Sequence, residues 1–143
     1  MSFNLYQENI LDHYENPHNR GTMQHPTIEF RDLNPLCGDE VCVQARLDEQ
    51  GRIAAICFDG KGCVISLASA SMLMEEVEGK PLAEVKRLDR QAMLDLLGIP
   101  LTAMRVKCAM LALRTLEKAI RHYEGKIEES AAQLNTNSTL PLR

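Results

Sequence analysis

The sequence has few of the features that mark nucleic-acid-binding, membrane-spanning or secreted proteins. It contains no tryptophan and only three tyrosines and three phenylalanines, which disfavours a platform of aromatic side chains that stack on bases. Its formal net charge of −4 gives no basic excess to attract nucleic acid. No apolar run approaches the ~20 residues of a membrane-spanning helix, and the first residues lack the pattern of a signal peptide. We therefore expect a cytoplasmic protein without nucleic-acid or membrane partners.

The sequence also lacks the motifs of several enzyme classes. It contains no P-loop, no GxGxxG and no Ser-His-Asp order, so kinase, dinucleotide-binding and hydrolase functions have no support. None of its four histidines neighbours one of the cysteines discussed below, which disfavours histidine as a ligand.

What the chain does have is an ordinary globular composition and an odd number of cysteines. With 143 residues, 45% hydrophobic and 25% charged, it is long enough for one domain with a hydrophobic core of its own. Five cysteines are present without any CxxC pair. In a reducing compartment such cysteines are more often packed thiols, metal ligands or reactive thiols than disulfides.

The spacing of hydrophobic residues predicts an α+β fold, with strands grouped first and helices after. We expect a three-stranded antiparallel sheet packed against about five helices in a single compact domain over residues 1–125. Residues 126–143 are polar and weakly patterned, which predicts a mobile C-terminal tail. The expected strands are 26–34, 40–48 and 52–59, and the expected helices are 3–14, 64–78, 82–87, 89–97 and one carrying residues 109–123.

Three cysteines lie where one predicted element gives way to the next. Cys37 lies in the turn between the first two strands, Cys63 between the third strand and a helix, and Cys108 near the start of the last helix. Together with Asp39 they would offer four anionic ligands, a set that zinc or a small iron–sulfur cluster accepts. These residues are therefore candidate metal ligands, although the spacing alone favours buried structural thiols.

Two cations precede the last of these cysteines. Arg105 and Lys107 lie three residues and one residue before Cys108, and nearby positive charge lowers a thiol's pKa and favours the nucleophilic thiolate. We therefore expect both residues to activate a thiolate, with Cys37 and Cys108 as candidate sulfur acceptors.

Several segments together resemble the U-type iron–sulfur cluster assembly scaffold family, which includes the IscU and SufU proteins and the N-terminal domain of NifU. The resemblance runs in order over about residues 3–124. The matching segments are residues 10–17 (ILDHYENP), 34–39 (NPLCGD), 60–72 (GKGCVISLASASM) and 105–108 (RVKC).

The resemblance implies a function, a ligand set and partners. It implies that Cys37, Asp39, Cys63 and Cys108 cluster at one end of the domain and hold a transient [2Fe-2S] cluster or Zn²⁺. The protein would then be a non-enzymatic scaffold. It would accept persulfide sulfur from a cysteine desulfurase and pass a labile cluster to apo acceptor proteins. Chaperones or an electron donor are further candidate partners.

The sequence departs from both main branches of the family, so alternatives remain open. The IscU branch has a histidine at the position of Lys107, and RVKC resembles the SufU branch. SufU proteins, however, carry an insertion between the last two site cysteines that the 45 residues from Cys63 to Cys108 leave no room for. The alternatives to a cluster scaffold are a zinc-dependent sulfurtransferase that stimulates a SufS-type desulfurase and a purely structural zinc domain.

Two cysteines do not match the family motifs. Cys42 and Cys57 alternate with apolar residues on adjacent predicted strands, which predicts partial exposure on the polar face of the sheet. A cross-strand redox pair is conceivable, but small residues without a chemical role are the favoured interpretation.

Overall fold

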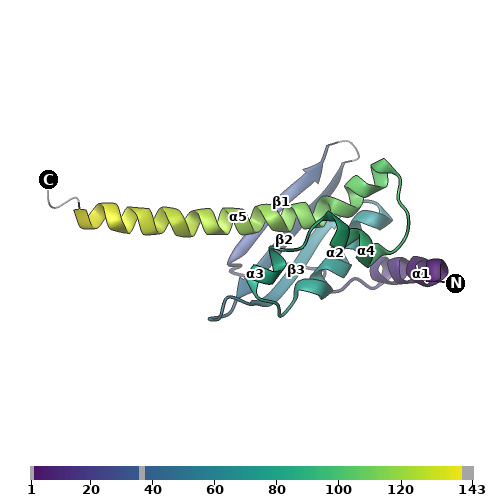
Figure 1. Cartoon of the computed structure of the whole chain (residues 1–143), viewed down its shortest axis with the longest axis horizontal. Helices are drawn as coiled ribbons and strands as arrows, with labels where there is room; N and C mark the ends of the chain where they lie inside the picture. The colour runs from purple at the N-terminus through teal and green to yellow at the C-terminus, as the bar shows by residue number, and fades with distance from the viewer. Residues whose placement is uncertain (1, 36–37, 140–143) are drawn as a thin grey trace.

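The computed structural model describes residues 2–35 and 38–139, which form one helix, then three strands, then four helices (Figure 1). The predicted α+β class, the single domain and the number of helices are confirmed. The elements are α1 (Ser2–Glu15), β1 (Ile28–Asn34), β2 (Asp39–Leu47), β3 (Ile53–Lys61), α2 (Val64–Val77), α3 (Leu82–Val85), α4 (Arg90–Leu97) and α5 (Ala103–Thr139).

The three strands form an antiparallel meander in the order β1-β2-β3, as predicted. The central strand β2 shows why the alternating pattern predicted it: Val41, Val43 and Ala45 are fully buried on one face of the sheet. Cys42 and Gln44 point to the opposite face, because successive side chains of a strand alternate. One face of the sheet is therefore apolar and needs a cover.

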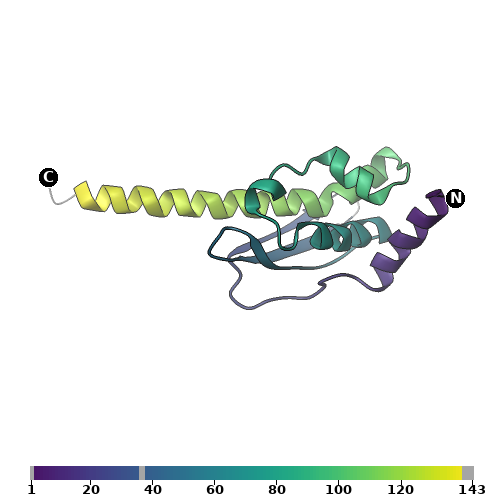
Figure 2. The ribbon, with the colours of Figure 1, turned by 60° about the horizontal axis from the view of Figure 1, so that its bottom comes forward.

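Helices α2 and α5 supply that cover (Figure 2). Helix α5 packs against β1 and β2, whereas α2 packs against β3, and the two helices also contact each other. The core between them is made of aliphatic side chains and Phe58 of β3, which is fully buried. Helix α1 packs on α2, where buried His13 hydrogen-bonds the Ser71 hydroxyl at 2.7 Å.

The short helices α3 and α4 connect α2 to α5. Helix α4 begins after Asp89, whose carboxylate accepts a hydrogen bond from the backbone N–H of Ala92, and ends at Gly98 with φ of 70°. A Cβ atom at Gly98 would lie 2.3 Å from the ring of Tyr6, so glycine also allows α1 to pack closely here. Among residues 2–35 and 38–139, no helix combines the length and apolarity needed to cross a membrane.

The largest difference from the sequence expectation is the length of α5. We expected a mobile tail from residue 126, outside any helix, and the structure instead continues α5 to Thr139, so that it projects far beyond the sheet (Figure 1). Ile127 is 50% exposed there. In the described chain no other element packs against the projecting turns of α5. These turns therefore need no apolar stripe, and their sequence lacks the periodicity that is typical of a packed helix.

Candidate metal centre

Three of the four predicted ligands come together at the junction of β2, α2 and α5. One ligand atom each from Asp39, Cys63 and Cys108 lies within 4.8 Å of the other two. Asp39 is the first residue of β2, Cys63 caps the N-terminus of α2, and Cys108 lies in the second turn of α5. The fourth predicted ligand, Cys37, lies outside the described residues, so its membership of the set stays a prediction.

The donor set fits a thiophilic cation or cluster. Two cysteine sulfurs and one carboxylate oxygen are ligands that zinc accepts, and cysteine sulfur is the usual ligand of iron–sulfur clusters. Asp39 and Cys108 are buried, with Cys108 only 2% exposed, whereas Cys63 is half-buried. A carboxylate held this deep needs hydrogen bonds or a cation to offset the loss of its hydration.

Ser66 supplies one such hydrogen bond and was missed by the sequence interpretation. Its hydroxyl, fully buried on α2, donates to Oδ2 of Asp39, and its Oγ also lies 3.5 Å from the sulfur of Cys63. Residues three apart on a helix share a face, so the spacing of Cys63 and Ser66 was the available signal. Ser66 therefore links two of the candidate ligands.

Gly62 makes room for the carboxylate of Asp39. A Cβ atom at this position would lie 2.8 Å from Cγ of Asp39, closer than non-bonded atoms normally approach. The glycine before Cys63 is therefore a packing requirement of the centre, since any other side chain would push Asp39 away.

A cavity opens to solvent beside Cys63. Its volume is about 560 Å³, and Arg105 of α5 stands at its wall with Tyr14 of α1. The complete lining is Tyr14, Gly62, Cys63, Val64, Ile65, Leu101 and Arg105. A reacting group from another protein can therefore approach the centre from the side of Cys63, next to a guanidinium.

The two cations that we expected to act together lie in different surroundings. Arg105 lines the cavity at Cys63, whereas Lys107 lines a separate hollow between β1 and α5. Cys108 is the sixth residue of α5, beyond the first turn, in which a helix N-terminus most favours a thiolate. Whether either cation activates a thiolate stays a prediction, and the geometry favours Arg105 for Cys63.

Cys42 and Cys57 lie away from the centre, on the outer face of the sheet. In the β2–β3 register Cys42 is opposite Asp59 and Cys57 is opposite Gln44, so the two cysteines are diagonal neighbours. Burial raises the pKa of both thiols above its ordinary value, and neighbouring acidic groups add to the effect. Both side chains are half-buried, as predicted, and they are protonated thiols at neutral pH.

The chain matches the family model described as the NifU-like N-terminal domain over residues 5–130. The chain belongs to this family. The match spans Asp39, Cys63 and Cys108, which accounts for the resemblance seen in the sequence.

Curated relatives fall in both branches that the sequence resembles. The chain is 31% identical over 124 residues to the iron–sulfur cluster assembly scaffold protein IscU of Buchnera aphidicola, which covers 85% of this chain and 95% of the relative. It is 34% identical over 148 residues to the zinc-dependent sulfurtransferase SufU of Bacillus subtilis, which covers 87% of this chain and 99% of the relative. That second alignment is longer than the 143 residues of the chain, so the SufU protein contains residues that this chain lacks.

Solved structures share the fold. One, described as an iron–sulfur cluster assembly scaffold protein for the SUF system of Fervidobacterium islandicum, has a TM-score of 0.68 at 27% identity, covering 83% of this chain and 98% of that one. Another, of a hypothetical protein, has the same TM-score of 0.68 at 31% identity and covers 82% of this chain.

Proposed function

We propose that this protein is a scaffold and sulfur acceptor for iron–sulfur cluster assembly. It receives persulfide sulfur from a cysteine desulfurase and passes a labile [2Fe-2S] cluster to apo acceptor proteins. The observation that carries the proposal is the convergence of Asp39, Cys63 and Cys108 within 4.8 Å beside a cavity that is open to solvent. Membership of a family whose relatives include a named IscU scaffold supports it.

In the sulfur-transfer step a thiolate of this chain attacks the outer sulfur of the desulfurase persulfide. A new S–S bond forms on the scaffold, the S–S bond of the persulfide breaks, and the desulfurase cysteine leaves as a thiolate, so no external oxidant or reductant is needed. Cys37 and Cys108 are the acceptors that the sequence suggested. Since Cys108 is 2% exposed and Cys63 faces the cavity, a persulfide reaches Cys63 directly and Cys108 only after local opening.

Arg105 is placed to assist this step. A guanidinium at the wall of the cavity attracts an anionic persulfide and favours the thiolate of Cys63. Lys107 cannot ligate metal while it is protonated, so it does not replace the histidine that the IscU branch has at this position.

The partners follow from the chemistry. A desulfurase must supply the sulfur and apo iron–sulfur proteins must receive the cluster, while chaperones or an electron donor are further candidates. Cys42, Cys57 and Cys63 are free thiols among the described residues, which suits a reducing compartment, and we propose a cytoplasmic location.

A second candidate function is a zinc-dependent sulfurtransferase. The RVKC segment and the 34% identity to a protein of that name favour it. Asp39, Cys63, Cys108 and the predicted ligand Cys37 would hold the ion, which would keep its cysteine ligands deprotonated.

The two functions are separated by metal analysis of protein purified anaerobically without chelators, followed by cluster loading with a desulfurase, cysteine, a ferrous salt and a thiol reductant that converts persulfide sulfur to sulfide. The scaffold predicts a [2Fe-2S] absorbance that transfers to an apo-ferredoxin. Stoichiometric zinc that persists through loading, together with faster desulfurase turnover, supports the sulfurtransferase instead.

A matched pair of cysteine variants provides the control. Cys63→Ser should lose the cluster, whereas Cys57→Ser, which changes a half-buried cysteine on the far face of the sheet, should load normally. Equal loading of both variants would contradict the proposed centre.

A further inference from the structure

A second hollow lies on the other flank of the metal centre, between the edge strand β1 and helix α5. Its volume is about 350 Å³, compared with about 560 Å³ for the cavity at Cys63. It is lined by Asp32, Leu33, Asn34, Pro35, Lys107, Arg114 and Lys118, and we call it the cationic groove. Of the residues linked above to sulfur acceptance, only Lys107 lines it.

The cationic groove carries an excess of positive charge on an acidic protein. The chain as a whole has a formal charge of −4, yet this groove has three cations against one carboxylate. Asp32 is paired with Lys118 at 2.7 Å. Neither Lys107 nor Arg114 forms a salt bridge within residues 2–35 and 38–139, and both are exposed.

The spacing of the cations favours an extended ligand. Lys107, Arg114 and Lys118 recur at intervals of seven and four residues, which places them on one face of α5. Lys107 and Lys118 are eleven residues apart, which corresponds to about 16 Å along the helix axis. One small anion cannot contact both ends of such a row, whereas a polypeptide segment with several carboxylates can. Leu33, 52% exposed at the rim, adds an apolar contact for the same segment.

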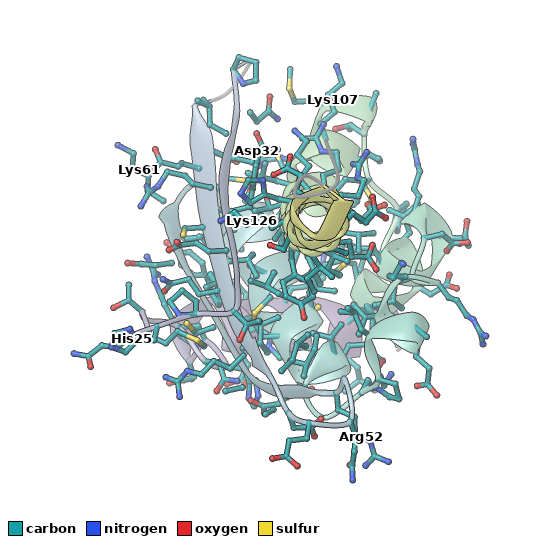
Figure 3. All side chains as sticks on the ribbon, turned by 90° about the vertical axis from the view of Figure 1, so that its left-hand side faces the viewer. His25, Asp32, Arg52, Lys61, Lys107 and Lys126 are labelled. Carbon is teal, nitrogen blue, oxygen red and sulfur yellow. The ribbon has the colours of Figure 1, made fainter. Side chains whose placement is uncertain are left out.

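The groove adjoins the centre without blocking it. Lys107 is next to Cys108 in α5, and Asn34 and Pro35 lead from β1 toward the turn before Asp39. Figure 3, which looks along α5, shows Asp32 in the space between the sheet and the helix, with Lys107 toward the same upper end of the view. A segment held here would lie beside the ligands while the cavity at Cys63 stays open for the reacting group.

We propose that the cationic groove docks an acidic segment of a partner protein, with Lys107 and Arg114 pairing with its carboxylates. The inference deepens the proposed function, because it gives the chemistry of a surface on a protein that exchanges sulfur or cluster at this centre. Ion pairs at the rim of the groove steer and orient the partner, and added salt weakens these ion pairs.

The test measures binding of a fluorescein-labelled oligo-glutamate peptide to the full chain by anisotropy. Arg114→Glu should weaken binding about ten-fold and Arg114→Ala about three-fold, as expected for partly exposed ion pairs. Arg121→Glu is the matched control: it makes the same charge change on the same helix, but Arg121 lines a different hollow with Val85 and Leu116. Peptide affinity should fall with added salt, and backbone NMR shifts should concentrate in β1 and the first half of α5.

Three results would overturn the docking proposal. Equal loss of affinity in the Arg114→Glu and Arg121→Glu variants would indicate non-specific attraction. Competition by inorganic phosphate at the same concentration as the peptide would indicate a small-anion site. NMR shifts outside the groove would place the binding elsewhere. Because the assay uses neither metal nor desulfurase, its failure leaves the metal centre untouched, and a failed cluster-loading experiment leaves the docking result standing.

Discussion

At the scale of single residues, the candidate centre consists of predicted ligands and of neighbours that contact them. Asp39 is the one carboxylate beside two described cysteines, and oxygen is a poorer ligand than sulfur for an iron–sulfur cluster. A site meant to release its cargo benefits from one weak ligand. Retention and delivery should therefore respond in opposite directions when Asp39 is removed.

The Asp39→Ala variant should hold a loaded cluster longer and deliver it more slowly to an apo-ferredoxin, because exchange through the oxygen ligand is lost. Cluster lifetime is read from the decay of its visible absorbance, and delivery from the ferredoxin signal. Asp95→Ala, which changes a carboxylate paired with Gln91 on α4, serves as the control. A shorter lifetime in Asp39→Ala would mean that Asp39 is an ordinary ligand.

Ser66→Ala removes the hydroxyl that donates to Asp39. Substituting a residue that orients a metal ligand typically lowers metal affinity by about 10–100-fold. We therefore expect the zinc affinity of this variant to fall by about ten-fold. Competition with a chromophoric chelator measures it. Ser69→Ala is a demanding control, because Ser69 is also fully buried on α2 but its hydroxyl has no hydrogen-bond partner in the described part of the chain. Equal affinities of the two variants would show that Ser66 only fills space.

Arg105→Ala should slow persulfide formation while leaving metal content nearly unchanged, because Arg105 lines the cavity without being a ligand. Lys107→His should instead improve cluster retention, since a neutral imidazole can ligate. Persulfide labelling and metal content are measured in parallel on both variants. If neither differs from the wild type, neither cation takes part in sulfur acceptance or metal binding.

At the scale of elements, β1 and α5 are joined by an ion pair at the edge of the sheet. Nζ of Lys118 lies 2.7 Å from Oδ2 of Asp32, and Asp32 is mostly buried, with an 18% exposed side chain. Burial alone raises the pKa of Asp32. The hydrogen bond from Lys118, the N–H of Leu33 and the charges of Lys118 and Arg114 together outweigh burial and lower that pKa below 3.8.

This lowered pKa predicts a pH-dependent stability. A carboxyl whose pKa is lower in the folded state stabilises the fold above its unfolded pKa and loses that contribution as pH falls through the folded value. Asp32→Asn should therefore reduce the free energy of unfolding by about 0.5–1 kcal/mol near neutral pH, and the difference from wild type should vanish below the folded pKa. Urea titrations of both proteins at several pH values measure this difference in the free energy of unfolding. A constant difference across that window would mean that the variant acts through packing.

The same elements show what the sequence could predict and what it could not. The meander followed from the alternation of residues such as Val41 and Val43, because each strand buries one face against the helices. The helix beyond Gly125 was missed, since its turns project from the domain and their side chains need no apolar stripe. The clustering of Asp39, Cys63 and Cys108 was expected from the family resemblance, because junction positions alone made them candidate ligands and only long-range packing decides whether three junctions meet.

At the scale of the whole molecule, the candidate metal centre lies apart from the bulk of the hydrophobic core. The core extends from β1–β3 through α2 to α5, and it includes fully buried Phe58, Leu73 and Leu116. The ligands lie at one end, where they join the starts of β2, α2 and α5. A chain of this size can keep such a core without a metal, in contrast to small zinc domains that unfold when the ion is removed.

Removing metal should therefore lower the melting temperature without unfolding the protein. Zinc at a hundredfold excess over its dissociation constant contributes about 2.7 kcal/mol, which for a domain of this size corresponds to a shift of about 10 °C. Chelator-treated and zinc-loaded samples are compared by calorimetry and by far-ultraviolet circular dichroism. Cys63→Ser should lose most of the shift and Cys57→Ser should keep it, since of the two only Cys63 is a candidate ligand. Loss of the cooperative transition on chelation would show that the core depends on the metal, which would favour a structural zinc domain over a scaffold that must stay folded after its cargo has left.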